Sequence, residues 1–373
     1  MKAIISGGGT GGHIFPAIAI ANAIKARYSD ADILFIGAEG RMEMEKVPAA
    51  GYPIKGLPIA GLQRKLTPTN IVKNLMLPFK MLRSRRMVKK IIREFNPDIV
   101  VGVGGFASEP TLKAAAQMGY PTLLQEQNSY AGLTNKMLSK GAKTICVAYE
   151  GMERFFPKEK IVFTGNPVRA EIEEATASRE EGRSFFGLRS DSRVILVVGG
   201  SLGARSINNM IISNIETNSK IFADNNIQVI WQTGSYMHEM AVGFVKSSEM
   251  GEVVKVHKFI SRMDLAYAAA DIVISRAGAL SISELCIVGK PTILIPSPNV
   301  AEDHQTKNAN ALAQKGAALL IRDDECKEKG IEAAIGILND TEKQNSMSTN
   351  IKNMASRKAA DKIVDEIAKI INK

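Results

Sequence analysis

The stretch Ser6-Gly7-Gly8-Gly9-Thr10-Gly11-Gly12-His13 decides the fold, because it joins a strand-like segment to a helix-like one. The apolar run 3–5 precedes it, and the segment 16–27 follows with apolar residues at helical spacing. A strand, a glycine turn and a helix together direct backbone N–H groups and a helix N-terminus at an anion. Glycine leaves room for the backbone to touch a phosphate and tolerates positive φ. We therefore predict a phosphate-binding loop.

His13 is the residue of this loop whose side chain titrates near neutral pH. A neutral imidazole can take a proton from a hydroxyl group, so His13 is a candidate general base. The alternative is a loop histidine that only helps to bind a diphosphate. The residues themselves leave both interpretations open.

The strand–loop–helix pattern occurs again near residue 193, which predicts a two-domain α/β protein with two Rossmann-like units and parallel sheets. The predicted domains are 1–165 and 166–344, with a helix at about 345–373 that could pack back on the first domain. Short apolar runs rich in β-branched residues predict strands at 2–6, 32–36, 98–103, 121–124, 143–147, 193–198, 227–231, 253–256, 271–274, 292–295 and 318–321. Helices are predicted at 16–27, 71–95 and 108–118.

The net charge of +10 is concentrated in the first half of the chain. Residues 1–165 hold 23 Lys and Arg against 12 Asp and Glu, and the remainder holds 25 against 26. This asymmetry predicts attraction of the first domain to an anionic surface and disfavours a nucleic-acid-binding protein. Three widely spaced cysteines predict neither disulfides nor a metal site. We expect a cytosolic protein or one on the cytosolic face of a membrane, because no apolar run approaches the roughly 18–20 residues that span a bilayer.

The segment 71–95 combines apolar residues with eight basic residues and one acid, which is typical of a helix that lies on an anionic membrane. The predicted membrane contact covers about 64–95. Pro78 should kink or interrupt the helix. The alternative is an amphipathic helix that covers the sheet and has a solvated basic face. Replacing Arg83, Arg85 and Arg86 with Glu should weaken binding to anionic liposomes under the first interpretation.

A second glycine loop at 102–108 follows the strand 98–103. Together with the first loop it could hold one diphosphate, through Gly9, Gly104 and Gly105. The alternative is that these glycines only allow tight packing of a helix on a strand. The polar run 125–128 contains Glu126, a second candidate base, although such a run can also cap a helix.

Three further motifs in the second half predict a nucleotide-sugar site. The glycine loop 199–203 opens a helix, and the small residues of 276–283 would let a ligand approach another helix N-terminus. Glu284 can accept hydrogen bonds from ribose hydroxyls, and Gln305 can bond to a sugar. The alternative for Glu284 is a first-turn glutamate that only stabilises its helix, and the alternative for Gln305 is a polar residue of the surface.

A nicotinamide-dependent dehydrogenase is disfavoured although Gly7-x-Gly9-x-x-Gly12 matches the dinucleotide fingerprint. Glu39 comes somewhat late for the acid that holds the ribose, and the motifs of the second half would have no role.

The ordered motifs GGGTGGHIFPA, GGFAS, EQNSYAGLTNK, GNPVR, GGSLGARSIN, RAGALSISE and EDHQTKNA resemble the MurG family of bacterial peptidoglycan glycosyltransferases. This resemblance implies a GT-B fold and transfer of N-acetylglucosamine (GlcNAc) from UDP-GlcNAc to the 4-hydroxyl of the muramoyl sugar of lipid I, giving lipid II with inversion. It also implies a peripheral enzyme on the cytoplasmic face of the inner membrane, active in cell wall synthesis.

The resemblance also implies which residues bind UDP-GlcNAc, and leaves His13 and Glu126 as the first and second choices for the base. Positions matching the family's UDP-GlcNAc-binding residues are Thr10, Gly11, Gly12, Asn128, Arg169, Ser201, Ile260, Ala279, Leu280, Ser281, Ile282, Ser283, Glu284 and Gln305. Ser201, Arg169 and the helix after 199–203 would meet the charge of the departing UDP. No cofactor or metal is expected, since these groups would stabilise the leaving diphosphate without a bound metal ion.

Two residues depart from the family pattern: His304 stands where some members have glutamine, and Glu109 stands where glycine is common. The rival functions are a GT-B transferase with another lipid acceptor, a UDP-GlcNAc 2-epimerase and a non-catalytic UDP-sugar-binding protein. An epimerase would need catalytic carboxylates and histidines in both domains, and the chain has four histidines.

Overall fold

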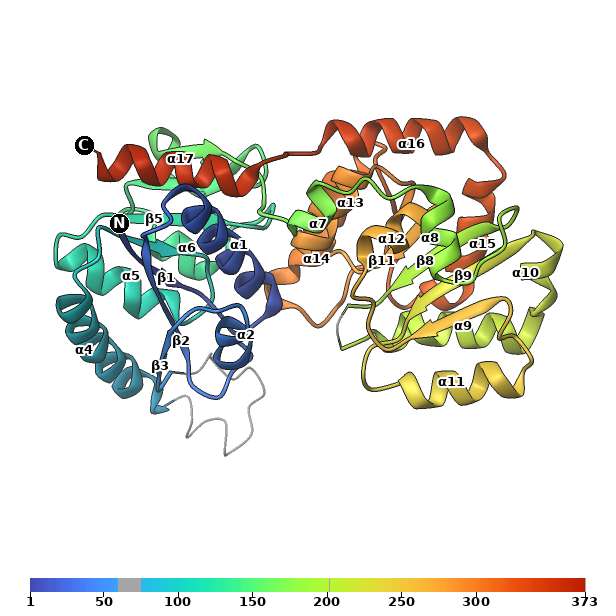
Figure 1. The fold of residues 1–373 in the computed structure, drawn as a ribbon, viewed down its shortest axis with the longest axis horizontal. Coiled ribbons are helices and arrows are strands. Elements are labelled where there is room, and N and C mark those ends of the chain that lie inside the picture. The colour runs from blue at the N-terminus through green and yellow to red at the C-terminus, as the bar shows by residue number, and fades with distance from the viewer. Residues whose placement is uncertain (60–74, 201, 373) are drawn as a thin grey trace. The chain divides into compact units, whose positions relative to one another are not determined.

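The computed structural model describes residues 1–59, 75–200 and 202–372. The chain divides into two compact units, shown in Figure 1. The first unit comprises Met1–Val168 and Ser356–Lys373, and the second comprises Arg169–Ala355. Each is built around its own parallel sheet with helices on both faces, so the α/β class with two Rossmann-like sheets is confirmed.

In the described part of the first unit, the sheet has the strand order β3-β2-β1-β4-β5-β6-β7. Its elements are β1 (Lys2–Ser6), α1 (Gly11–Arg27), β2 (Asp32–Ala38), α2 (Glu43–Ala49), β3 (Ile54–Leu57), α4 (Leu77–Phe95), β4 (Ile99–Gly102), α5 (Ser108–Gln117), β5 (Thr122–Glu126), α6 (Leu133–Leu138), β6 (Thr144–Val147), η1 (Met152–Arg154), η2 (Lys158–Lys160), β7 (Ile161–Phe163) and α17 (Ala359–Ile371).

Alternating strand residues of this unit form two separate cores. Ile5 packs with residues of α1 and α17 on one face of the sheet. Ile4 packs with residues of α4 and α5 on the other face. Successive side chains of a strand point to opposite faces, so a sheet covered on both sides requires continuous apolar strands.

In the second unit, the described strands have the order β10-β9-β8-β11-β12-β13. Its elements are α7 (Ala170–Glu173), α8 (Arg179–Phe185), β8 (Arg193–Val198), α9 (Arg205–Asn218), α10 (Lys220–Asp224), β9 (Ile227–Gln232), α11 (His238–Ser247), β10 (Val254–His257), α12 (Met263–Ala269), β11 (Ile272–Ser275), α13 (Ala279–Val288), β12 (Thr292–Leu294), η3 (Ala301–Asp303), α14 (His304–Ala313), β13 (Leu319–Leu320), α15 (Cys326–Leu338) and α16 (Thr341–Asn353).

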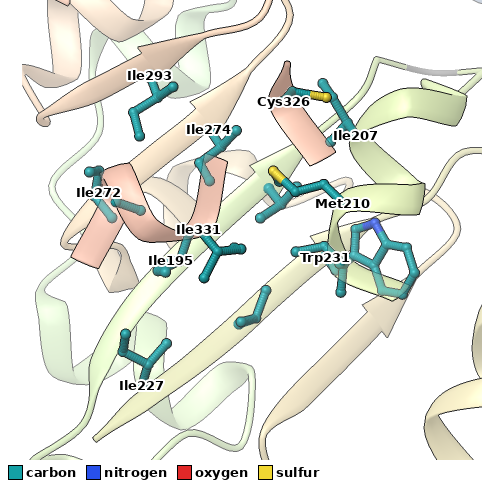
Figure 2. Close-up of a cluster of buried hydrophobic side chains, with 14 of the residues drawn as sticks. Ile195, Ile207, Met210, Ile227, Trp231, Ile272, Ile274, Ile293, Cys326 and Ile331 are labelled. Atoms are coloured by element: carbon teal, nitrogen blue, oxygen red, sulfur yellow. The ribbon is translucent and has the colours of Figure 1, made fainter. Parts of the chain in front are cut away.

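The core of the second unit lies between the sheet and helices α9 and α15. Figure 2 shows Ile195 and Ile274 from the sheet beside Met210 of α9 and Ile331 of α15. Trp231 is fully buried in the same cluster, and its indole N–H donates to Asn208 Oδ1 at 3.0 Å. The buried polar edge of the tryptophan is therefore satisfied.

Several predicted elements differ from the observed ones. The first helix begins at Gly11 and not at 16, so His13 lies in the first turn of α1. A turn at Met76 precedes α4, and Pro78 lies in the first turn of that helix, so the predicted helical segment 71–95 is interrupted beside Pro78. Residues 60–74, part of the predicted membrane segment, lie outside the described residues. The predicted terminal helix is two helices, α16 and α17, and only α17 belongs to the first unit.

Candidate active site

The first glycine loop connects β1 to α1, and the buried carboxylate of Glu43 accepts a hydrogen bond from it. Glu43 is 1% exposed, and its Oε1 and Oε2 accept hydrogen bonds from Ala38 N and Gly9 N, each at 3.0 Å. A Cβ at Gly8 would lie 2.1 Å from Glu43 Oε1, so glycine is required there. Sequence reasoning missed Glu43, since its position in α2 follows no motif.

The second glycine loop lies directly beside the first. Strands β1 and β4 are paired neighbours, so both loops emerge at the same edge of the sheet. Gly104 and Gly105 have φ of 89° and 81°, and a Cβ at Gly105 would lie 2.3 Å from Gly8 O. The two loops therefore approach each other as closely as glycine backbones allow.

His13 faces the second glycine loop from the first turn of α1. A Cβ at Gly104 would lie 3.0 Å from His13 Cε1, and His13 Nδ1 lies 3.0 Å from Gln127 Oε1. Burial lowers the pKa of His13, although the charge of Glu126 and the hydrogen bond to Gln127 partly oppose that effect. The imidazole is therefore neutral at neutral pH and able to accept a proton.

Glu126 is the centre of a hydrogen-bonded loop. Its Oε1 accepts from Asn128 N at 3.0 Å and from Asn128 Nδ2 at 3.2 Å. Its Oε2 accepts from Gly132 N at 3.0 Å and from Asn135 Nδ2 at 2.8 Å. The side chain is 1% exposed. Four hydrogen-bond donors of the protein therefore occupy the carboxylate of Glu126, the second candidate base.

In the second unit, Glu284 is held by two side chains. Arg169 donates from Nε to Oε1 at 2.7 Å and from Nη2 to Oε2 at 2.9 Å, and Tyr267 donates to Oε2 at 3.3 Å. Burial opposes the charge of Arg169, but hydrogen bonds to Glu284 and its negative charge outweigh burial and raise the pKa of the guanidinium. The structure therefore brings two predicted residues together and adds Tyr267, which no motif had indicated.

The other predicted residues of the second unit lie at the ends of its strands and helices. Ile260 N donates to Gln232 Oε1 at 2.9 Å, and Gln305 Oε1 accepts from Ser297 N at 2.8 Å. Ala279, Leu280, Ser281 and Ser283 lie partly exposed in the first turns of α13, whereas the Ile282 side chain is 2% exposed. Ser201 lies outside the described residues.

The predicted site residues thus fall into one group per unit. Gly9, Thr10, Gly11, Gly12, His13, Gly104, Gly105, Glu126 and Asn128 belong to the first unit, and Arg169 to Gln305 belong to the second. Within residues 1–59, 75–200 and 202–372, no group of three or more His, Cys, Asp or Glu side chains is placed to hold a metal ion. None of the described helices is long and apolar enough to cross a membrane.

Both halves of the chain match models of one enzyme family. Residues 3–147 match the glycosyltransferase family 28 N-terminal domain, and residues 194–363 match the C-terminal domain of that family. The chain belongs to glycosyltransferase family 28. Family 28 membership makes it a glycosyltransferase, which confirms the enzyme class predicted from the motifs and removes the dehydrogenase alternative.

Relatives within family 28 match over the whole chain. A protein of Parabacteroides distasonis is 57% identical over 372 residues, covering 100% of this chain and 99% of its own length. A Cytophaga hutchinsonii protein is 54% identical and covers 100% and 97%. Both are named UDP-N-acetylglucosamine--N-acetylmuramyl-(pentapeptide) pyrophosphoryl-undecaprenol N-acetylglucosamine transferase.

Solved structures agree with the family assignment. Acinetobacter baumannii MurG has a TM-score of 0.78 at 27% identity, with 99% of both chains covered. A UDP-GlcNAc 2-epimerase from Neisseria meningitidis, solved with UDP-GlcNAc, has a TM-score of 0.68 at 14% identity, with 99% of this chain and 100% of that chain covered. The second likeness concerns the fold alone.

Proposed function

We propose that this enzyme transfers GlcNAc from UDP-GlcNAc to the muramoyl sugar of lipid I, forming lipid II with inversion at the anomeric carbon. The observation that carries the proposal is the 57% identity, over essentially the full length, to a transferase named for that donor and acceptor. A conserved reaction is the economical explanation of such an identity when both family 28 domains are present.

The proposed chemistry is a single displacement. His13 takes the proton of the acceptor hydroxyl while that oxygen bonds to the anomeric carbon and the bond to UDP breaks on the opposite face. His13 is preferred to Glu126 because burial favours its neutral form, whereas four protein N–H groups already occupy the Glu126 carboxylate. The base assignment thus rests on how each side chain is bonded.

The adjacent glycine loops of the first unit are the proposed site for the acceptor diphosphate. Gly104 and Gly105 precede the N-terminus of α5, and Gly9 lies in the loop that leads into α1. Backbone N–H groups at two helix N-termini favour an anion. Gly9 contributes differently than its sequence suggested, because its N–H already donates to Glu43.

The donor nucleotide is proposed to bind the second unit. Glu284 would accept hydrogen bonds from ribose hydroxyls, with Arg169 and Tyr267 fixing the carboxylate. The N-terminus of α9 follows the loop 199–203 and would stabilise the charge of departing UDP. Arg169 supports this site through Glu284, since its guanidinium is already in a bidentate ion pair.

A radiolabel assay tests donor and acceptor together. Purified protein should transfer label from UDP-GlcNAc to lipid I in the presence of EDTA. Label transfer to another lipid acceptor, with lipid I left unmodified, would contradict the acceptor assignment. Donor binding without transfer to any lipid would contradict the catalytic function.

We also propose that α4 attaches the enzyme to the cytoplasmic face of the inner membrane. Phe79 is 74% exposed and Leu82 49% exposed, and Arg83 and Arg86 are exposed beside them. Apolar side chains flanked by cations suit an anionic bilayer surface. Arg85 is unsuitable for a charge-reversal test, because it forms an ion pair with the buried Glu109.

Replacing Phe79 and Leu82 with Ser should therefore reduce co-sedimentation with phosphatidylglycerol vesicles. Phe185→Ser is the control, because Phe185 is 58% exposed but lies in α8 of the second unit. Equal co-sedimentation of the double variant and wild type would return α4 to the role of a solvated amphipathic helix.

A further inference from the structure

Three buried amide side chains form a continuous hydrogen-bonded relay that ends at His13. Gln125, Gln127 and Asn166 are 0%, 1% and 2% exposed. Gln125 and Gln127 flank Glu126, and Asn166 lies in the segment that leads out of the first unit. An amide has a donor end and an acceptor end, so its orientation can be assigned from its neighbours.

A backbone carbonyl fixes the orientation of Asn166. Its Nδ2 lies 2.9 Å from Gln127 O, and a carbonyl oxygen can only accept, so the amino group must face it. The Asn166 Oδ1 then faces Gln125, whose Nε2 donates to it at 2.9 Å. The Oε1 of Gln125 consequently points toward Gln127.

The amino group of Gln127 is surrounded by acceptors. Its Nε2 donates to Val103 O at 2.8 Å and to Gln125 O at 3.2 Å, and it also contacts Gln125 Oε1. Reversing this amide would place an oxygen against three oxygens and leave a buried donor without its acceptors, which is costly. The Oε1 of Gln127 is therefore the atom that faces His13.

The consequence for His13 is a defined tautomer. Gln127 Oε1 has no hydrogen, so the 3.0 Å contact requires that His13 Nδ1 donate. Neutral imidazole has one N–H, so protonation of Nδ1 leaves the lone pair on Nε2.

We infer that the relay Asn166–Gln125–Gln127 fixes neutral His13 as the Nδ1–H tautomer, so that Nε2 is the atom that takes the acceptor proton. This inference rests on the proposed role of His13 as the base. Gln127 is then a positioning residue that acts through His13, and the buried relay explains why the neighbours of Glu126 are amides. An amide holds the tautomer without adding a charge beside the base.

Nitrogen NMR of histidine-labelled protein tests the tautomer in the resting enzyme. The His13 signals are assigned by their loss in His13→Gln. At a pH where the ring is neutral, the expected pattern is a protonated Nδ1 and an unprotonated Nε2. A His13 spectrum with a protonated Nε2, or with both tautomers populated, would overturn the inference.

Gln127→Met tests the positioning role, with Gln228→Met as the control for loss of a buried glutamine outside the site. Gln228 is 2% exposed and lies on β9 of the second unit. The first variant should populate both His13 tautomers and lower kcat about 10- to 100-fold, with KM for UDP-GlcNAc nearly unchanged. Unchanged tautomer and kcat in Gln127→Met would contradict the role of the relay.

The two proposals fail in different experiments. The tautomer is observed without substrate, so its failure appears in the NMR spectrum even if lipid II is formed. Failure of the proposed function appears in the label-transfer assay of the wild-type enzyme, whichever ring nitrogen of His13 carries the proton.

Discussion

His13 and Glu126 differ in how much of their hydrogen-bonding capacity the protein already uses. Both oxygens of Glu126 accept hydrogen bonds from its own loop, so the carboxylate stabilises the conformation of that loop. His13 uses Nδ1 toward Gln127. A general base needs a lone pair that no hydrogen bond from the protein occupies. The hydrogen bonds of the two side chains therefore favour His13 over Glu126, a choice that the sequence could make only from residue type.

The pH dependence of kcat/KM should report His13. Burial lowers the pKa of His13 below that of an ordinary histidine, although the charges of Glu126 and Glu43 and the hydrogen bond to Gln127 oppose this effect. A base is inactive when protonated, so activity should be retained near neutral pH and lost on acidification, with a midpoint below that of an ordinary histidine. A midpoint at or above the ordinary value, measured from initial rates, would contradict the assignment.

Tyr267→Phe should raise KM for UDP-GlcNAc about three- to tenfold and leave kcat nearly unchanged, because one hydrogen bond that orients Glu284 is lost. Tyr236→Phe is the matched control, since Tyr236 is 82% exposed. Steady-state kinetics with donor as the varied substrate measures both. A lower kcat at constant KM would place Tyr267 in a different role.

At the scale of elements, one ion pair joins α4 to α5. Arg85 of α4 contacts Glu109 of α5, whose side chain is 7% exposed, and Lys113 lies 3.8 Å from the same carboxylate. Glu109 was noted in the sequence as a departure from the family pattern. Its partner could not be foreseen, because residues 24 positions apart meet only through packing of two helices.

Arg85→Met should destabilise the protein by about 1–3 kcal/mol, because it leaves the Glu109 carboxylate buried with a weaker partner. Arg83→Met, an exposed position of the same helix, should change stability by no more than about 0.5 kcal/mol. Urea unfolding measures both variants. Equal stability of the two would mean that the pair contributes nothing to the α4–α5 contact.

The central strands were predictable from sequence, whereas the start of α1 and the edge strands β3 and β7 of the first unit were not. β1 and β8 appear as predicted because buried parallel strands are continuous apolar runs. β3 and β7 are short edge strands with partly exposed residues, so their pattern is weak. α1 extends back to Gly11 because first-turn N–H groups need no partner within the helix.

At the scale of the whole molecule, the chain returns to its first unit through α17. Ile363 and Ile367 share a core with Ile20 of α1, and Arg27 pairs with Asp365 at 2.6 Å. The sequence pattern suggested one long terminal helix. Residues 354–358 separate α16 from α17. Lys358 in this segment has a φ of 55°, which is incompatible with a continuous helix.

Ile367→Ala should destabilise the first unit by about 2–5 kcal/mol, because the lost side chain leaves a cavity in a closed core. Ile370→Ala, at a partly exposed position of the same helix, should cost less. Thermal unfolding distinguishes the two. If both variants unfold with the wild type, α17 contributes little to the stability of the first unit.

In the candidate site, features formed by contiguous residues were predicted, whereas contacts between residues distant in the sequence were not. Glycine loops and helix N-termini follow from contiguous sequence, and so they were predicted. Glu43, Gln127 and Tyr267 act on site residues that are 34, 114 and 17 positions away. Their roles depend on side-chain contacts that folding creates, and no spacing rule in one sequence reports them.

The role of His13 as the base is tested most directly by comparing His13→Ala with the wild-type enzyme in two measurements on the same preparation: turnover with lipid I, and UDP-GlcNAc affinity by calorimetry. We expect turnover to fall by about 100-fold or more while donor affinity is nearly unchanged, because most of the predicted donor-binding residues lie in the second unit. Near-normal turnover, or a loss fully explained by weaker donor binding, would contradict His13 as the base.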